Sequence, residues 1–240
     1  MIDIPRIRFA QLPTPIERMP RLSAALGGPN LWIKRDDQTG LAMGGNKTRK
    51  LEFLIAEAQA HGAHTLITAG AVQSNHCRQT AAAAAQHGFK CILVLSGNPP
   101  KEISGNLLLD HMLGAQIVWT SRSERDHTLQ KAFNEAWSAG KRPYLIPYGG
   151  SSPTGVAGYA YAVGELMQQC DPQQEIPMPD WIVFATSSGG TQAGLTVGAK
   201  AFQYPGKILG ISIDEKAEAL KARVADLATQ TADLIRFPAS

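Results

Sequence analysis

The sequence has few of the residues that mark several common classes of protein. Only three cysteines occur among 240 residues, Cys77, Cys91 and Cys170, and they form no CxxC pair. Their odd number and wide spacing support neither a disulfide framework nor a structural zinc site. The formal net charge is only +3, and no basic run is interleaved with aromatic residues. The composition therefore argues against a nucleic-acid partner.

Long apolar runs are also missing from the sequence. No run approaches the roughly 20 residues that a membrane-spanning helix needs, and residues 1–6 lack the apolar core of a signal peptide. We therefore expect no membrane partner and a cytoplasmic location. The six histidines show no metal-ligand spacing, so we also expect no metal.

Strand-like and helix-like segments alternate along most of the chain. The expected strands are residues 31–35, 65–69, 90–95, 116–120, 144–147, 181–185 and 207–213. The expected helices are residues 20–26, 75–87, 104–113, 124–139, 155–169, 191–203 and 215–230, with one more beginning near Asn46 or Lys47. This order predicts an α/β fold with parallel sheets covered by helices on both faces.

The stretch Gly44-Gly45-Asn46-Lys47-Thr48-Arg49-Lys50-Leu51 places a lysine where a glycine-containing loop becomes a helix. The first-turn amide groups, together with the charges of Arg49 and Lys50, are expected to lower the pKa of Lys47. A lysine that is partly neutral can attack a carbonyl and form a Schiff base. A solvated surface lysine is the plainer alternative. A P-loop is excluded by spacing, since its pattern requires glycine where Leu41 and Asn46 stand.

Two loops follow expected strands at the carboxyl ends where ligands gather in parallel sheets. In the first, residues 186–194, the segment Ser188-Gly189-Gly190-Thr191 leads into a helix. Its glycines allow close approach, and its hydroxyl and amide groups can hold a phosphate. A tight turn that binds nothing is the alternative. The loop lacks the G-x-G-x-x-G form, so a dinucleotide is not favoured.

The second loop, residues 70–76, ends in Gln73-Ser74-Asn75-His76 at a helix start and can receive a carboxylate. Helix capping by Ser74 is the plainer alternative. A thiol and base formed by His76 and Cys77 is rejected, because adjacent residues on a helix do not face each other.

Taken together, these motifs resemble the D-cysteine desulfhydrase and 1-aminocyclopropane-1-carboxylate deaminase family, within the tryptophan synthase β-like enzymes that use pyridoxal 5′-phosphate (PLP). The resemblance runs from about Leu12 to Ile213. It is carried by Leu12-Pro13-Thr14-Pro15, Lys34-Arg35-Asp36-Asp37, Gly44 to Leu51, Gly70 to Arg78 and Ser188 to Gly194.

The resemblance implies a role for each site residue. Lys47 would hold PLP as a Schiff base and, once freed, act as the base at Cα, while Asn75 would bond the ring 3-hydroxyl. Ser74, with Gln73, would face the substrate carboxylate or reacting group, and Asn75 and His76 would lie beside the substrate. The segment Ser188, Gly189, Gly190 and Thr191 would bind the phosphate.

The implied function is a lyase that eliminates sulfide from D-cysteine, giving pyruvate and ammonia, with the deaminase reaction as the alternative. His76 favours the desulfhydrase, because deaminases more often carry glutamine there. The implied fold is the two-lobed fold type II, with residues 48–159 as the smaller lobe and residues 1–47 plus 160–240 as the larger one. We expect a small amino-acid substrate and a homodimer.

Family members continue well beyond the helix expected at residues 215–230. That continuation supplies tyrosines at the substrate and the group that faces the pyridine nitrogen. We therefore expect an incomplete larger lobe with uncovered apolar surface. A truncated, catalytically impaired PLP-binding protein is the resulting alternative, unless another chain supplies the missing parts.

Overall fold

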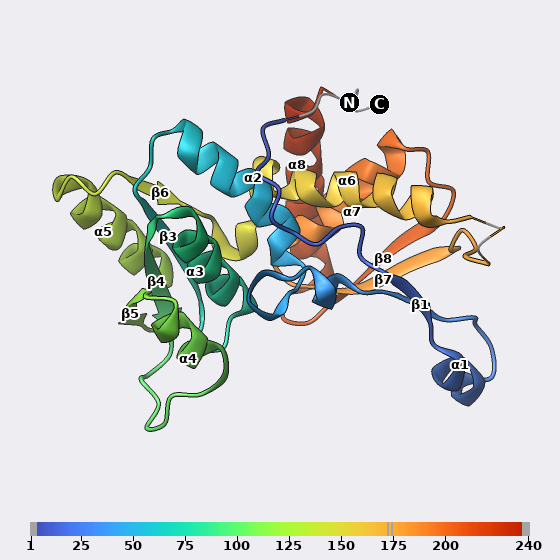
Figure 1. Ribbon diagram of the computed structural model, residues 1–240, viewed down its shortest axis with the longest axis horizontal. Coiled ribbons are helices and arrows are strands. Elements are labelled where there is room, and N and C mark those ends of the chain that lie inside the picture. The colour runs from blue at the N-terminus through green and yellow to red at the C-terminus, as the bar shows by residue number, and fades with distance from the viewer. Residues whose placement is uncertain (1–3, 172, 174, 237–240) are drawn as a thin grey trace.

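The computed structural model describes residues 4–171, 173 and 175–236. Its elements form two parts, shown on the left and right of Figure 1. The left part is built on a four-stranded sheet, and the right part combines a strand pair with three helices. Helix α2 (Lys47–Ala60) joins the two parts, because it packs against helices of both.

The four-stranded sheet is entirely parallel, as the alternating pattern predicts. Its strands lie in the order β5 (Gln116–Thr120), β4 (Lys90–Ser96), β3 (Thr65–Ala71) and β6 (Pro143–Leu145). The connecting helices are α3 (Asn75–His87), α4 (Gly105–Met112) and α5 (Arg125–Ser138).

Both faces of this sheet are covered. Leu66 and Leu93 pack on one face with residues of α2, α3 and α4, among them Leu51 and Leu107. On the opposite face a second cluster joins Ile67, Ala69, Ile92 and Val94 to Ala132 and Ala136 of α5. Burial on both faces explains why β3 and β4 are apolar without alternation.

The right part contains the parallel pair β7 (Trp181–Thr186) and β8 (Lys207–Ser212) with helices α6 (Pro153–Gln169), α7 (Gly190–Ala201) and α8 (Ala217–Leu234). Ile182, Phe184 and Ile208 pack beneath α6 and α7. The alternate side chains are exposed: Trp181, Val183, Leu209 and Ile211. The uncovered apolar sheet surface expected from the sequence is therefore present.

Residues 1–30 are rich in proline, and the sequence predicts an irregular arm there with one short helix. The described part of this arm also contains a strand. Helix α1 (Pro20–Leu26) has the expected bounds, but β1 (Ile16–Arg18), which pairs with β2 (Trp32–Lys34), was missed. Several other boundaries also differ from those expected, and two of these differences have a clear cause. Strand β6 ends before Pro147, which has no amide hydrogen for a ladder. Helix α6 begins at Pro153, where Ser152 caps it by accepting from the amide of Gly155.

Among the described residues, no helix is both long and apolar enough to cross a membrane. No group of three or more histidine, cysteine, aspartate or glutamate side chains in that part of the chain is placed to hold a metal ion.

Candidate functional site

Helix α2 begins at Lys47 as predicted, and the loop before it is held by close backbone packing. Gly44 has a φ of +68°, and a Cβ there would lie 1.9 Å from the carbonyl oxygen of Asp37. The hydroxyl of Thr39 accepts from the amide of Gly45 at 2.9 Å and lies 3.0 Å from the hydroxyl of Thr48. The glycines thus allow a tight turn that fixes where α2 starts.

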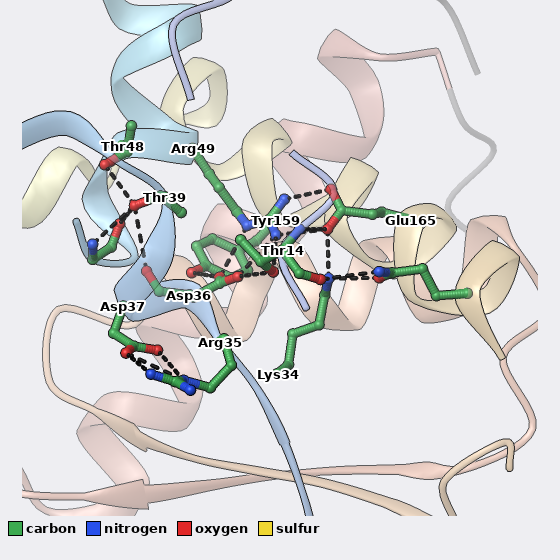
Figure 2. Close-up of polar contacts among 12 residues, drawn as sticks. Thr14, Lys34, Arg35, Asp36, Asp37, Thr39, Thr48, Arg49, Tyr159 and Glu165 are labelled. Carbon is green, nitrogen blue, oxygen red and sulfur yellow. Dashed lines mark hydrogen bonds and ion pairs between the residues drawn. The ribbon is translucent and has the colours of Figure 1, made fainter. Parts of the chain in front are cut away.

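An ion network anchors the first turn of α2 to the arm and to α6 (Figure 2). The Arg49 guanidinium donates to Asp36 and Glu165, each at 2.8 Å. Lys34 also donates to Glu165, at 2.5 Å, and the Tyr159 hydroxyl donates to Asp36 at 2.6 Å. Burial raises the pKa of Glu165, but its bonds to Arg49 and Lys34 outweigh this and lower the pKa to about 2.

The pKa of Lys47 is lowered, as expected, but for a different reason. Burial lowers it to about 8. The expectation that Arg49 contributes was wrong, because its charge is compensated by Asp36 and Glu165 within the network. Lys50 was also expected to contribute, but burial is the only cause resolved for the lowered pKa of Lys47, and the pKa of Lys50 is itself well below its ordinary value.

Lys50 is a second lysine of the site, which the sequence analysis did not assign. Its side chain is fully buried, and its Nζ donates to the carbonyl of Gly149 at 3.2 Å. Burial, and then the charge of Lys47, place its pKa well below the ordinary value. The available signal was the spacing of three residues from Lys47, which puts both lysines on one face of the helix.

The Ser188–Thr191 loop, between β7 and α7, meets this helix face. A Cβ on Gly190 would lie 2.7 Å from Nζ of Lys50 and 2.4 Å from Oγ of Ser151. Ser151 also donates to the Ser188 hydroxyl at 2.8 Å, and Asn46 donates to the Thr191 hydroxyl at 3.2 Å. The two glycine-containing motifs, far apart in the sequence, therefore come together at one place.

The space between the Ser188–Thr191 loop and Lys50 has the chemical groups that bind a phosphate. The loop offers hydroxyl groups and the free amides of the first turn of α7, and Gly190 leaves space next to the buried amine of Lys50. A bound dianion favours the ammonium form of Lys50 and offsets the effect of its burial. The residues present thus fit a phosphorylated ligand.

The loop from Gly70 to His76 lies at the carboxyl end of β3, and its residues have unequal surroundings. The Ser74 hydroxyl accepts from the amide of Cys77 at 3.2 Å, which confirms the helix-capping alternative. His76 is buried, with Nε2 at 2.9 Å from the hydroxyl of Thr68. Burial, followed by the charges of Lys47 and Lys50, places the pKa of His76 well below its ordinary value, so the imidazole is neutral.

Gln73 and Asn75 contact the start of α4. The Gln73 side chain donates to the carbonyl of Ser104 at 3.1 Å and accepts from the amide of Asn106 at 2.8 Å. Both of its polar atoms are therefore used by α4, although the resemblance implied that Gln73 faces the substrate. Asn75 is exposed, and its Oδ1 accepts from Nδ2 of Asn106 at 2.9 Å. Asn106 was missed because nothing in its local sequence distinguishes it.

A cleft of about 950 Å³ opens between the carboxyl edge of the four-stranded sheet and the loop that contains Ser188. Its walls include Ser96 and Thr120, at the ends of β4 and β5, and Ser151 and Ser188 opposite them. The carboxyl edge of a parallel sheet is where open α/β folds bind small molecules. The two lysines and the Ser188–Thr191 loop, with a cleft that reaches the loop at Ser151 and Ser188, suit a small phosphorylated carbonyl compound.

Comparison with known proteins gives the family. The model of the pyridoxal-phosphate dependent enzymes matches residues 7–239. The chain is 43% identical over 227 residues to a D-cysteine desulfhydrase of Salmonella typhimurium. The aligned region covers 92% of this chain and 68% of that protein. The Salmonella choleraesuis desulfhydrase is also 43% identical, over 93% of this chain and 69% of its own length. The chain belongs to the family of pyridoxal-phosphate dependent enzymes, and its cofactor is PLP.

Solved structures give the same fold. A homologue of ACC deaminase (1-aminocyclopropane-1-carboxylate deaminase) superposes with a TM-score of 0.91 at 37% identity, over 99% of this chain and 71% of that one. A threonine deaminase from T.th. superposes with a TM-score of 0.67 at 23% identity, over 83% of this chain and 59% of that one, and supports the fold alone. The predicted fold type II architecture is confirmed.

Proposed function

We propose that this protein is a PLP-dependent lyase that eliminates sulfide from D-cysteine, releasing pyruvate and ammonia. The observation that carries the proposal is that Lys50 lies against Gly190 of the Ser188–Thr191 loop, while Lys47, three residues before it on the same face of α2, is close enough for its charge to lower the pKa of Lys50. The names of the desulfhydrase relatives support the choice of substrate.

The proposal gives the two lysines different tasks. Lys50 lies against Gly190 and Gly149, so we assign it to the phosphate, together with Ser188, Gly189, Gly190 and Thr191. Lys47 is less completely buried and has a pKa of about 8. It therefore keeps a neutral fraction near pH 7 that can bond a carbonyl carbon and later take the proton from Cα of the substrate.

Three neighbouring residues complete the assignment. Asn75 holds the ring 3-oxygen, and Ser74 and His76 lie beside the substrate. When bound, PLP supplies the conjugated ring that accepts the electron pair left on Cα. His76 is neutral and bonded to Thr68, so it can contact a thiolate leaving group without adding charge to the site.

The test is borohydride reduction followed by peptide mapping. We expect one pyridoxyl adduct, on Lys47, and its loss in Lys47→Ala together with the visible absorbance band. Lys47 and Lys50 lie in one helix turn, so the mapping must resolve single residues. An adduct on Lys50, or an unchanged band in Lys47→Ala, would remove Lys47 from this role.

Deamination of 1-aminocyclopropane-1-carboxylate is the second candidate, because the structure with a TM-score of 0.91 is described as an ACC deaminase homologue. Sulfide and pyruvate formed from D-cysteine support the desulfhydrase, whereas 2-oxobutyrate formed from the cyclopropane amino acid supports the deaminase. A protein that binds PLP but turns over neither substrate would be a catalytically impaired member of the family.

We further propose two lobes, residues 48–159 and residues 1–47 plus 160–240, in a homodimer located in the cytoplasm. The four-stranded sheet falls within the first range, and β7, β8, α7 and α8 fall within the second. Helix α6 crosses the boundary, although it packs on α7 and α8.

The buried thiols Cys77 and Cys91 are free, which suits a reducing compartment. Sedimentation of the holoenzyme tests the dimer.

A further inference from the structure

Asn106, at the start of α4, uses its whole side chain to hold the loop that contains Asn75. Its Nδ2 donates to the carbonyl of Gln73 at 2.8 Å and to Oδ1 of Asn75 at 2.9 Å. Its Oδ1 accepts from the guanidinium of Arg78 at 3.2 Å. One amide thus connects Gln73, before α3, to Asn75 and Arg78 in the first turn of α3.

The direction of these hydrogen bonds is fixed by Arg78. A guanidinium has only donors, so the amide of Asn106 must turn its oxygen toward Arg78 and its nitrogen toward Asn75. Asn75 must then turn its oxygen toward Asn106, which leaves its own NH₂ group as a donor for a ligand. The opposite orientation of either amide would set two donors or two acceptors against each other.

Arg78 is itself held in place by the loop that precedes Lys47. Its second terminal nitrogen donates to the carbonyl of Gly44 at 2.7 Å, and the Gln79 amide donates to the same oxygen. The guanidinium is largely buried, so its orientation is determined by these contacts rather than by solvent. The chain of bonds therefore extends from the glycine turn at Lys47 to the NH₂ group of Asn75.

We propose that Arg78 and Asn106 are positioning residues that fix Asn75 as a hydrogen-bond donor, so that the site selects an anionic acceptor, the ionised 3-oxygen of PLP. This inference rests on the proposed function, which places Asn75 at that oxygen. The positioning role explains why the side-chain amide of Asn75, although exposed, keeps one orientation. The buried guanidinium of Arg78 fixes the amide of Asn106, which in turn fixes that of Asn75. Neither Arg78 nor Asn106 needs to touch the cofactor.

The test uses replacements that remove the donor from Asn106 at nearly constant size. Asn106→Asp retains an acceptor for Arg78, and Asn106→Leu removes the donor without adding charge. For both variants we expect PLP affinity to fall about tenfold, which is the effect of one hydrogen bond to an ionised group. The pH midpoint of the visible absorbance change should rise by about one unit, because an oxyanion that loses a donor binds its proton more tightly.

Two further variants distinguish positioning from general loosening. Arg78→Lys retains a donor for Asn106, so its pH midpoint should stay near that of the wild type even if the melting temperature falls. Asn134→Asp, on exposed α5, makes the same chemical change far from the chain of bonds and should change neither quantity. The titratable groups at the site, Lys47, Lys50 and His76, are the same in all variants. So is Asp110 of α4, which interacts with Arg78 and whose pKa burial raises to about 7, and Arg78→Lys keeps a cation beside it.

The outcomes separate this inference from the proposed function. If the wild type binds PLP and Asn106→Leu has the same PLP affinity and the same pH midpoint, the positioning role of Arg78 and Asn106 is overturned and the proposed function stands. If the wild type does not bind PLP, the proposed function is overturned and the positioning role with it. A pH midpoint that rises in Asn106→Leu and Asn106→Asp but not in Arg78→Lys would support the positioning role.

Discussion

Replacing Lys50 by methionine should weaken PLP binding and at the same time stabilise the protein without its cofactor. Methionine has nearly the same volume and no charge, so the packing of this fully buried position is retained. On the proposed assignment of Lys50 to the phosphate, the lost interaction is one charge-assisted hydrogen bond, worth about 1.5–3 kcal/mol. PLP affinity should therefore fall roughly 10- to 150-fold.

The gain in stability follows from the sign of the pKa shift. The folded-state pKa of Lys50 lies well below the ordinary value of 10.5, mainly through burial. Between these two values the unfolded chain binds more protons than the folded one, so the free energy of unfolding rises with pH. Lys50 is thus most destabilising at low pH, and its effect disappears above about pH 10.5. Lys50→Met should remove this part of the pH dependence.

Two measurements on the cofactor-free protein check both effects. Titration with PLP, followed by visible absorbance, gives the affinity, and thermal unfolding between pH 6 and pH 10 gives the stability. At pH 7 the melting temperature should rise by a few degrees, since ~1 kcal/mol corresponds to about 2–4 °C at this chain length. Lys131→Met, at an exposed lysine of α5, is the matched control. Unchanged PLP affinity in Lys50→Met, or a lower melting temperature, would refute the reasoning.

Three further predictions concern the scaffold. Arg49→Met leaves the carboxylates of Asp36 and Glu165 without their main partner, and urea unfolding should show a loss of about 3–5 kcal/mol. Glu165, whose pKa is about 2 against 4.5 unfolded, stabilises the fold above about pH 4.5 and less as the pH falls toward 2; acid unfolding of Glu165→Gln should lack this part of the pH dependence. Ser74→Ala removes the cap of α3 and should cost about 1 kcal/mol in thermal unfolding; no change would exclude the capping role.

Local patterns were enough for most of the fold. Helix α3 and strand β5 have the predicted bounds, because their apolar periodicity ends at clear signals such as the Ser74 cap and the left-handed Gly88. Strand β1 was missed because it lies in a proline-rich arm and is held by pairing with β2, which is a tertiary contact. Its three residues, Ile16–Arg18, show no periodicity of their own.

The site could be predicted only in part, for a similar reason. Loops at strand ends are visible in the sequence, so the segments around Ser74 and Ser188 were identified. Their meeting with α2 depends on tertiary contacts such as the bond from Asn46 to Thr191. Asn106 could not be found, because its importance lies in three hydrogen bonds to a segment about 30 positions away.

The first turn of α2 shows how one short segment serves both the scaffold and the chemistry. Successive residues of a helix are rotated by about 100°, so Lys50 lies only about 60° around the axis from Lys47, whereas Arg49 lies about 160° away. Arg49 therefore points to Asp36 and Glu165, while Lys47 and Lys50 share the face that meets the Ser188–Thr191 loop. Asp36 and Glu165 compensate the charge of Arg49, which anchors the helix. Lys47 and Lys50 have no such partner within the described part of the chain, so burial lowers their pKa values. The same turn thus holds a permanent cation for stability and two lysines whose pKa values are lowered by burial.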